Sequence, residues 1–175
     1  MPDPTSLFGP TERTVTRSGE RRTVRLQRSY DATPAAVWSA CTEPKRVARW
    51  IGELTGEHAI GGEVRLRMTA EETVVLRIEA CAEPHRLTAT WSTPDEPDSR
   101  IELTLEARGD ATLLSLEHSQ LVDERAAAGK GLGWEDFLDR LRELLAGRPP
   151  EGVQWADSVA RLKPLWEAAA AYRTS

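Results

Sequence analysis

Three glycines and a lysine stand close together at Gly129, Lys130, Gly131 and Gly133, directly before an amphipathic segment. Such residues could hold a phosphate group, because glycine-rich backbone and a helix N-terminus bind anions and a lysine adds positive charge. The spacing does not fit either known motif. A P-loop requires serine or threonine after the lysine, but Lys130 is followed by Gly131. The dinucleotide-binding motif requires a strand directly before the glycines, and the alanines at 126–128 do not predict a strand. We therefore expect no phosphate site and no cofactor.

The histidines and cysteines do not predict a metal centre or a nucleophile. His58, His85 and His118 are far apart and lack the spacing of metal ligands. The chain contains no Gly-x-Ser-x-Gly motif, and neither Cys41 nor Cys81 lies in a known catalytic motif. Two cysteines in 175 residues are typical of a reducing cytoplasm, where both are expected to be small buried residues.

Two polar residues interrupt the apolar faces of predicted strands. Arg28 shares a face with Leu26, and His118 shares a face with Leu116. A buried polar group needs a partner, because leaving it unpaired is costly. One interpretation is an internal hydrogen bond or a place at the open end of the sheet. The other is that Arg28 and His118 orient a polar or acidic part of a ligand, or act in an enzyme of the cyclase or hydrolase type.

Composition limits the classes of partner. The net charge of -5 argues against a nucleic-acid partner, and no apolar run is long enough for a membrane span of roughly 20 residues. The polar first twenty residues contain no signal-peptide core, so we expect a cytoplasmic protein. The expected division is a disordered N-terminus over 1–12, one domain over 13–147 and a helical extension over 148–175.

The apolar periodicity places the elements that must position these residues. A hairpin turns at Ser18-Gly19, and two short helices begin at Pro34, with Thr33 as the cap, and at Pro44. Alternating apolar residues then predict an antiparallel sheet from five strands, which cover 61–68, 73–80, 85–91, 100–107 and 111–118.

A long amphipathic helix is predicted from Trp134 to Gly147, with its apolar stripe covering the sheet. The preceding segment, Leu121–Gly133, is predicted to be a loop that acts as a mobile lid anchored by Trp134; an ordinary flexible loop is the alternative. In the tail, Pro164 should kink or split a helix. Trp155 and Trp166 on this helix are expected to dock either onto the domain or onto a second subunit, and the second alternative would give a homodimer.

Several stretches resemble the SRPBCC (START-like) superfamily, and more narrowly its branch similar to the C-terminal domain of activators of the heat-shock protein 90 ATPase. They are "VRLQRSYDATPAAVWSACTEPKRVARWIG", "IGGEVRLRM", "EPHRLTATW", "ATLLSLEHSQL" and "GLGWEDFLDRL". The resemblance extends from about Val15 to Gly147. It implies an α+β helix-grip fold, in which a curved antiparallel sheet and two small helices surround a long C-terminal helix and a hydrophobic cavity.

The resemblance leaves three functions open, because one fold hosts many activities. Members bind lipids, polyketides or other hydrophobic molecules, act as cyclases or hydrolases, or serve as co-chaperones of heat-shock protein 90 in the stress response. The chain is too short for the additional N-terminal chaperone-binding domain of the eukaryotic activators. Binding of a small hydrophobic molecule is the leading expectation, with the cavity lined by Arg28, Trp50, Leu66, Met68, Leu76, Trp91, Leu103, Leu116, His118, Trp134 and Leu138.

Overall fold

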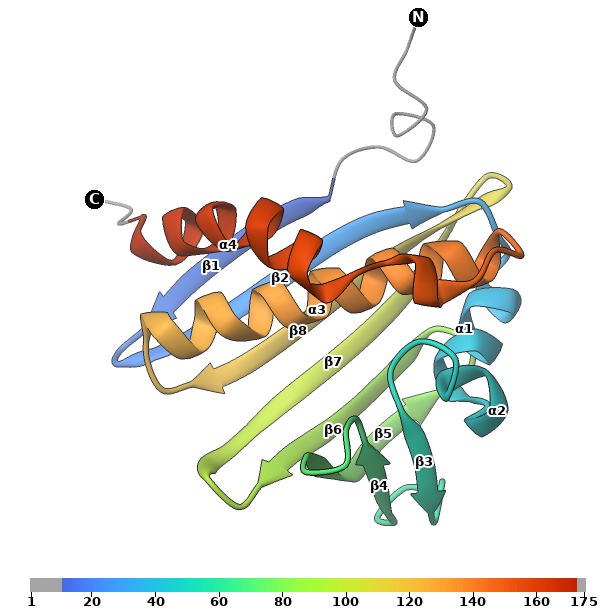
Figure 1. Ribbon diagram of the computed structural model, residues 1–175. Coiled ribbons are helices and arrows are strands. Elements are labelled where there is room, and N and C mark those ends of the chain that lie inside the picture. Colours follow the sequence, from blue (N-terminus) through green and yellow to red (C-terminus); the bar gives the residue numbers. More distant parts are fainter. Residues whose placement is uncertain (1–10, 173–175) are drawn as a thin grey trace, which may run out of the picture.

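An eight-stranded antiparallel sheet wraps around one long helix in the computed structural model, which describes residues 11–172 (Figure 1). The strand order across the sheet is β1-β2-β8-β7-β6-β5-β4-β3. The strands are β1 (Glu12–Ser18), β2 (Arg21–Tyr30), β3 (Glu53–Gly56), β4 (Glu63–Arg67), β5 (Thr73–Ala82), β6 (Arg86–Thr93), β7 (Glu96–Arg108) and β8 (Ala111–Leu121). The helices are α1 (Pro34–Thr42), α2 (Pro44–Val47), α3 (Glu124–Leu145), η2 (Pro150–Gly152) and α4 (Trp155–Ala171). The predicted α+β helix-grip fold is confirmed.

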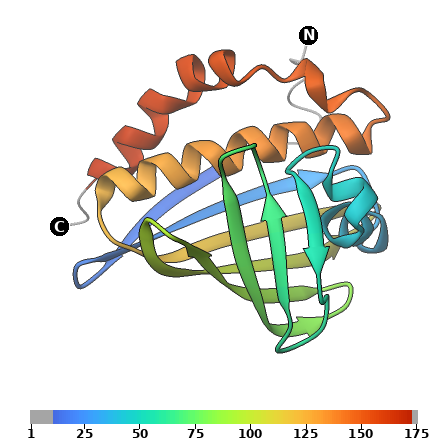
Figure 2. The ribbon, with the colours of Figure 1, turned by 60° about the horizontal axis from the view of Figure 1, so that its bottom comes forward.

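The alternation of apolar and polar residues produces a sheet with one covered face. In β4, for example, Val64 and Leu66 are buried while the residues between and beside them are exposed. The strand register shifts at three places, between β2 and β8, between β5 and β6, and between β6 and β7. Such irregularities bend a strand and increase its twist, so they help the sheet to curl around α3. Figure 2 shows the two halves of the sheet below this helix.

The two short helices follow β2 as expected. Thr33 caps α1 by accepting a hydrogen bond from the Ala36 backbone amide at 3.2 Å, and Pro34 occupies the first turn. Pro44 begins α2 directly after α1 ends. Together they cover the end of the sheet, close to α3 (Figure 1).

The predicted loop before the long helix is wrong. The helix α3 begins at Glu124, ten residues before Trp134, so all three glycines and Lys130 lie inside it. Asp123 caps its first turn by accepting a hydrogen bond from the Ala126 amide at 2.8 Å. A mobile lid at Leu121–Gly133 is therefore excluded. The C-terminal end was predicted correctly, since Gly147 follows with a left-handed φ of 74°.

The helix α4 explains why this glycine-rich stretch is helical. It runs through Pro164 as one helix and packs on α3, on the side away from β3–β6 (Figure 2). Trp166 is fully buried against Gly131, whereas Trp155 is 52% exposed. Trp166 therefore docks the tail onto the domain, as predicted, whereas Trp155 is half exposed, and its docking onto a second subunit stays a prediction.

Three further differences concern strands and termini. The four-residue strand β3 was not predicted, and β7 begins at Glu96, inside a segment predicted to be a turn. The predicted disorder of 1–12 falls outside the described residues except at its end, where Glu12 is the first residue of β1. Within residues 11–172, no helix is long and apolar enough to cross a membrane.

The long helix covers the two halves of the sheet unequally. It packs on β2 and β8, where the Tyr30 hydroxyl donates a hydrogen bond to the Leu138 carbonyl at 2.8 Å. The half formed by β3–β6 curls away below α3 (Figure 2). The apolar side chains on the inner face of β3–β6 line the candidate site.

Candidate functional site

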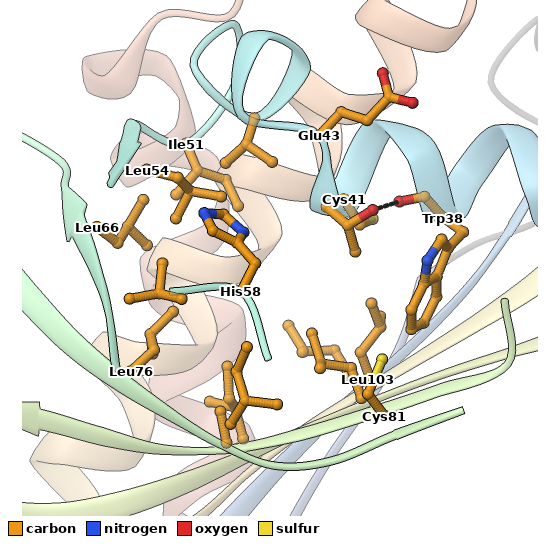
Figure 3. Close-up of a pocket in the computed structure, with 18 of the residues that line it drawn as sticks. Trp38, Cys41, Glu43, Ile51, Leu54, His58, Leu66, Leu76, Cys81 and Leu103 are labelled. Carbon is orange, nitrogen blue, oxygen red and sulfur yellow. Dashed lines mark hydrogen bonds between the residues drawn. The ribbon is translucent and has the colours of Figure 1, made fainter. Parts of the chain in front are cut away.

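An apolar cavity of about 510 Å³ lies between α1, α2, α3 and the inner face of β3–β8 (Figure 3). Its walls are formed mainly by aliphatic side chains of the strands and by four tryptophans, Trp38, Trp50, Trp91 and Trp134. All four indoles are at least 93% buried. A concave, mostly apolar space of this size fits a small organic molecule.

The mouth of the cavity is polar. The exposed residues among those that line it include Glu43 between α1 and α2, His58 in the β3–β4 loop, and Cys81 and Glu83 at the end of β5. In Figure 3 the ring of His58 lies over the cavity, whereas the carboxylate of Glu43 points outward from the helices. A molecule that enters would place its apolar part inside and its polar part among these groups.

The structure brings most of the predicted ligand-binding residues together. Eight of the eleven line the cavity: Trp50, Leu66, Leu76, Trp91, Leu103, Leu116, Trp134 and Leu138. Met68 does not, because β4 ends at Arg67 and the chain turns outward, where the Met68 amide donates to the Glu72 carbonyl. Met68 instead lines an outer groove, whose lining also includes Trp50, Trp91 and Trp134.

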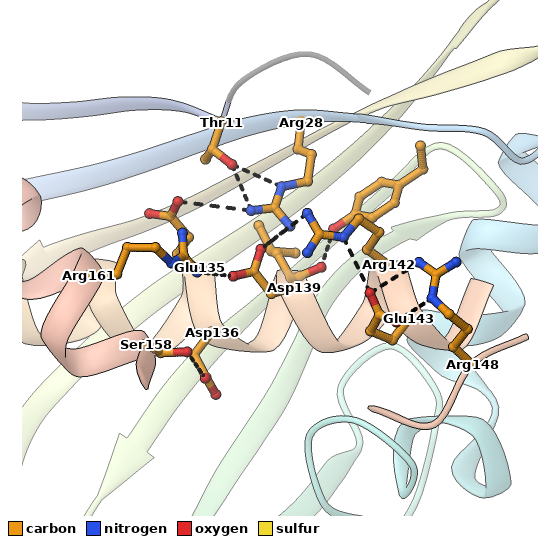
Figure 4. Close-up of polar contacts among 12 residues, drawn as sticks. Thr11, Arg28, Glu135, Asp136, Asp139, Arg142, Glu143, Arg148, Ser158 and Arg161 are labelled. Atoms are coloured by element: carbon orange, nitrogen blue, oxygen red, sulfur yellow. Dashed lines mark hydrogen bonds and ion pairs between the residues drawn. The ribbon is translucent and has the colours of Figure 1, made fainter. Parts of the chain in front are cut away.

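Arg28 lies outside the cavity, in a polar network between β2 and α3 (Figure 4). Its guanidinium is 2.8 Å from Asp139 and donates twice to the Thr11 hydroxyl, at 2.7 and 3.0 Å. Glu135, one turn earlier on α3, lies 3.9 Å away. Arg28 therefore has internal partners, and the expectation that it orients a ligand is wrong.

The same network attaches the C-terminal helix to the domain. Glu135 accepts from Arg13 of β1 and from the Trp166 indole, the latter at 2.8 Å, while Asp139 accepts from Arg161 at 2.8 Å. Asp136 accepts from the Ser158 hydroxyl at 2.6 Å. The polar face of α3 is thus a binding surface for α4, a role that the sequence did not reveal.

His118 is buried beside the cavity wall and has both ring nitrogens occupied. The Trp134 indole donates to Nδ1 at 3.0 Å, and Ser99 Oγ lies 2.7 Å from Nε2. An indole can only donate, so Nδ1 is the acceptor and the proton is on Nε2, which donates to Ser99. Burial, reinforced by the charge of Lys130, lowers the pKa of His118 to about 3. The ring is therefore neutral near pH 7, and its partners are internal, so the expectation that His118 lines the cavity and orients a ligand is wrong.

The two cysteines line the cavity in different environments. Cys41, on α1, is close to the interior, and burial raises the pKa of its thiol to about 12. Cys81, on β5, is exposed at the mouth, so the expectation that both thiols are buried is wrong for this one. Among the described residues, no group of three or more histidine, cysteine or acidic side chains is arranged to hold a metal ion.

The helical side of the cavity was not predicted from the sequence. Trp38, Val47, Ile51 and Leu54 line the cavity but were not among the predicted lining residues, because their segments are too short to show a clear periodicity. Ile78 and Ala89 could have been found, since each lies two residues from a predicted lining residue on the same strand face.

The comparisons with known proteins agree with this architecture. The family described as "Activator of Hsp90 ATPase homolog 1-like protein" matches residues 31–146. CalU16 from Micromonospora echinospora is 36% identical, with a TM-score of 0.80 over 93% of this chain and 99% of CalU16. DynU16, from the dynemicin biosynthetic locus, is 29% identical, with a TM-score of 0.69 over 73% of this chain and 49% of DynU16.

A more distant structure shows the fold alone. The Aha1 dimer from Colwellia psychrerythraea is 16% identical, with a TM-score of 0.64 over 70% of this chain and 95% of that one. No curated protein matches the sequence. Because the family match covers most of the chain and CalU16 aligns over nearly its whole length, this protein belongs to the Activator of Hsp90 ATPase homolog 1-like family, of SRPBCC type.

Proposed function

We propose that the protein binds a small hydrophobic molecule, lipid-like or polyketide-like, in the cavity beneath α3. The observation that carries the proposal is a space of about 510 Å³ with apolar walls and a polar mouth. Sites for small molecules commonly measure about 300–1,000 Å³ and combine apolar walls with a few polar groups. Burying the apolar surface of a ligand there would supply most of the binding free energy.

The similarity to DynU16 supports the same proposal. DynU16 comes from the dynemicin biosynthetic locus, and a locus of this kind makes a small organic molecule. The alignment with CalU16 covers 93% of this chain and therefore extends beyond the residues 31–146 that the family model matches.

Tryptophan fluorescence provides a direct test, because four of the six tryptophans line the cavity. Lipids and aromatic polyketides that enter it should change the emission and raise the melting temperature. The variant Ala89→Leu places a larger side chain on the cavity wall, in β6, and should weaken binding while the protein stays folded. Ala107→Leu is the matched control, since Ala107 is exposed on β7 and lies outside the lining. Equal affinities for the two variants would contradict binding in this cavity.

The family match favours a co-chaperone as the second candidate, since the matched family is named for activators of the Hsp90 ATPase. This function needs a protein-binding surface rather than a cavity. A pull-down with a heat-shock protein 90, followed by an ATPase assay, separates the two. Stimulation that Ala89→Leu leaves unchanged would favour the co-chaperone, whereas neither binding nor stimulation would eliminate it.

The third expectation, a cyclase or hydrolase reaction, relied on Arg28 or His118. Both side chains are held by internal partners outside the cavity lining. We therefore assign neither of them a catalytic role.

A further inference from the structure

Two of the residues that line the cavity carry a hydroxyl group, Ser39 and Thr42 of α1. Thr42 Oγ1 donates to the Trp38 carbonyl at 2.8 Å, so its proton is used inside the helix. Ser39 Oγ instead accepts from the Arg46 guanidinium of α2 at 2.9 Å, and its own proton has no acceptor among the described residues. Because a hydroxyl group can accept and donate at the same time, Ser39 is able to donate to a ligand.

The position of Ser39 on α1 directs it toward the cavity. Ala35, Trp38, Ser39 and Thr42 all line the cavity, and their spacing of three and four residues defines one face of the helix. Ser39 lies in the middle of this face and is half-buried. A ligand in the apolar space would therefore meet its hydroxyl group on the helical side of the cavity.

Arg46 supplies a positive charge behind this hydroxyl group. In residues 11–172, its half-buried side chain donates to Ser39 Oγ and, at 3.5 Å, to the Ala36 carbonyl, and it forms no ion pair with a carboxylate. The charge also acts on the cavity lining, since burial raises the pKa of the Cys41 thiol to about 12 and the charge of Arg46 opposes this rise. A hydroxyl group that accepts from a cation is polarised, so Ser39 should be a stronger donor than an isolated serine.

The carboxylates near the cavity do not cancel this arrangement. Glu43 and Glu83 belong to the lining, but both are exposed, and the Glu43 carboxylate points outward from the helices in Figure 3. Water screens exposed charges strongly, so their repulsion of a bound anion is weak. Ser39 and Arg46, in contrast, are joined by a direct hydrogen bond.

We infer that the polar end of the ligand is an acceptor oxygen, with a carboxylate or another acidic oxygen bound most tightly, which accepts a hydrogen bond from Ser39 Oγ and faces Arg46. The inference rests on the proposed function and names the polar group of the same ligand. A neutral carbonyl oxygen would gain the hydrogen bond, whereas a carboxylate would also gain attraction to the guanidinium. A molecule without an acceptor would depend on the apolar walls alone.

Three probes with one apolar body test the inference: 9-methylanthracene has no acceptor, 9-acetylanthracene has a neutral carbonyl, and 9-anthracenecarboxylate has a charged acceptor. Their affinities are measured by titration of the tryptophan fluorescence at about pH 8, above the usual range of histidine protonation, and at low salt. The affinity for 9-methylanthracene is the reference, since it reports any change in the apolar walls.

The variant Ser39→Ala removes the donor, and it should stay folded because alanine suits the interior of a helix. Relative to the reference, it should weaken binding of the ketone and the carboxylate by roughly three- to ten-fold. Arg46→Gln removes the charge and should weaken binding of the carboxylate by roughly two- to five-fold, and of the ketone less.

A matched control separates a local effect from net charge. Lys45→Gln removes one positive charge from the neighbouring residue of α2, which is exposed and outside the cavity lining, and it should leave the relative affinity for the carboxylate unchanged. If Lys45→Gln and Arg46→Gln act alike, or if Ser39→Ala affects the three probes equally, the inference is wrong and the cavity function stands. If none of the three probes binds to the wild-type protein, the proposed function fails together with the inference.

Discussion

The indole ring of Trp166 in α4 lies directly on the backbone of Gly131 in α3. A Cβ atom added to Gly131 would be 2.2 Å from Cε3 of this ring, a separation that no real contact allows. Trp166 is fully buried and donates to Glu135 at 2.8 Å, so it cannot move aside easily. This contact requires a glycine in the middle of α3, where glycine otherwise weakens a helix.

Gly131→Ala is therefore expected to destabilise the protein. Forcing a methyl group against the buried indole should lower the free energy of unfolding by about 1–3 kcal/mol, more than the gain in helix propensity restores. Gly133→Ala is the matched change two residues later, where nothing lies within 4 Å of the added atom. It should raise the free energy of unfolding by about 0.5–1 kcal/mol. Urea unfolding of both variants measures the contrast, and equal effects would show that Trp166 does not pack on Gly131.

The protein should lose stability in acid partly through His118. Burial, together with Lys130, lowers the pKa of this histidine from 6.5 to about 3, so the unfolded chain binds a proton that the folded state excludes. The stabilisation is complete above pH 6.5 and decreases as the pH falls toward 3, by on the order of 5 kcal/mol at most.

The variant His118→Gln isolates this contribution. A glutamine can accept from Trp134 and donate to Ser99, but it does not titrate. Denaturant unfolding at about pH 7 and pH 4.5 should show a smaller loss for the variant than for the wild type, because the carboxylates titrate in both. An identical loss in the two proteins would mean that His118 is protonated in the folded state.

Arg28→Met should destabilise the protein without changing ligand binding. The substitution leaves the buried carboxylate of Asp139 with Arg161 as its closest partner, at 2.8 Å. Breaking a buried pair usually costs about 3–5 kcal/mol, and the low end is expected because Arg161 remains. Arg77→Met, which breaks an exposed pair with Glu63, is the control and should cost less than about 1 kcal/mol. A loss of ligand affinity in Arg28→Met, measured with folded protein, would restore the role in ligand binding that the structure argues against.

The cysteines should differ sharply in reactivity. Cys81 is exposed, whereas the thiol of Cys41 has a pKa of about 12 and does not form the nucleophilic thiolate near pH 8. An aromatic disulfide reagent should therefore modify one thiol rapidly in the native protein, both after denaturation, and none rapidly in Cys81→Ser. A ligand in the cavity should protect Cys81, since this residue lies at the mouth. Rapid modification of Cys41 in the native protein would contradict the raised pKa of its thiol.

The sequence determined the elements whose signals are local. Alternating residues predicted the hairpin and the five following strands, Thr33 and Pro34 marked the start of α1, and Gly147 marked the end of α3. Five of the eight lining residues that were found lie on strands, where side chains two apart face the same way, and Trp134 and Leu138 lie one turn apart on α3. Each of these inferences depends only on neighbours within one strand or one helical turn, so the sequence alone is sufficient to make it.

Only the tertiary structure decided the features that depend on partners distant in the sequence. The glycines at 129–133 favour a loop locally, yet packing between α3 and α4 makes them helical and uses Gly131 for the close approach of Trp166. Arg28 and His118 could be recognised as buried polar groups, but whether they meet a ligand or the protein depended on Asp139 and Trp134, more than 15 residues away in the chain. A buried polar group requires a partner, and the sequence does not say which one the fold provides.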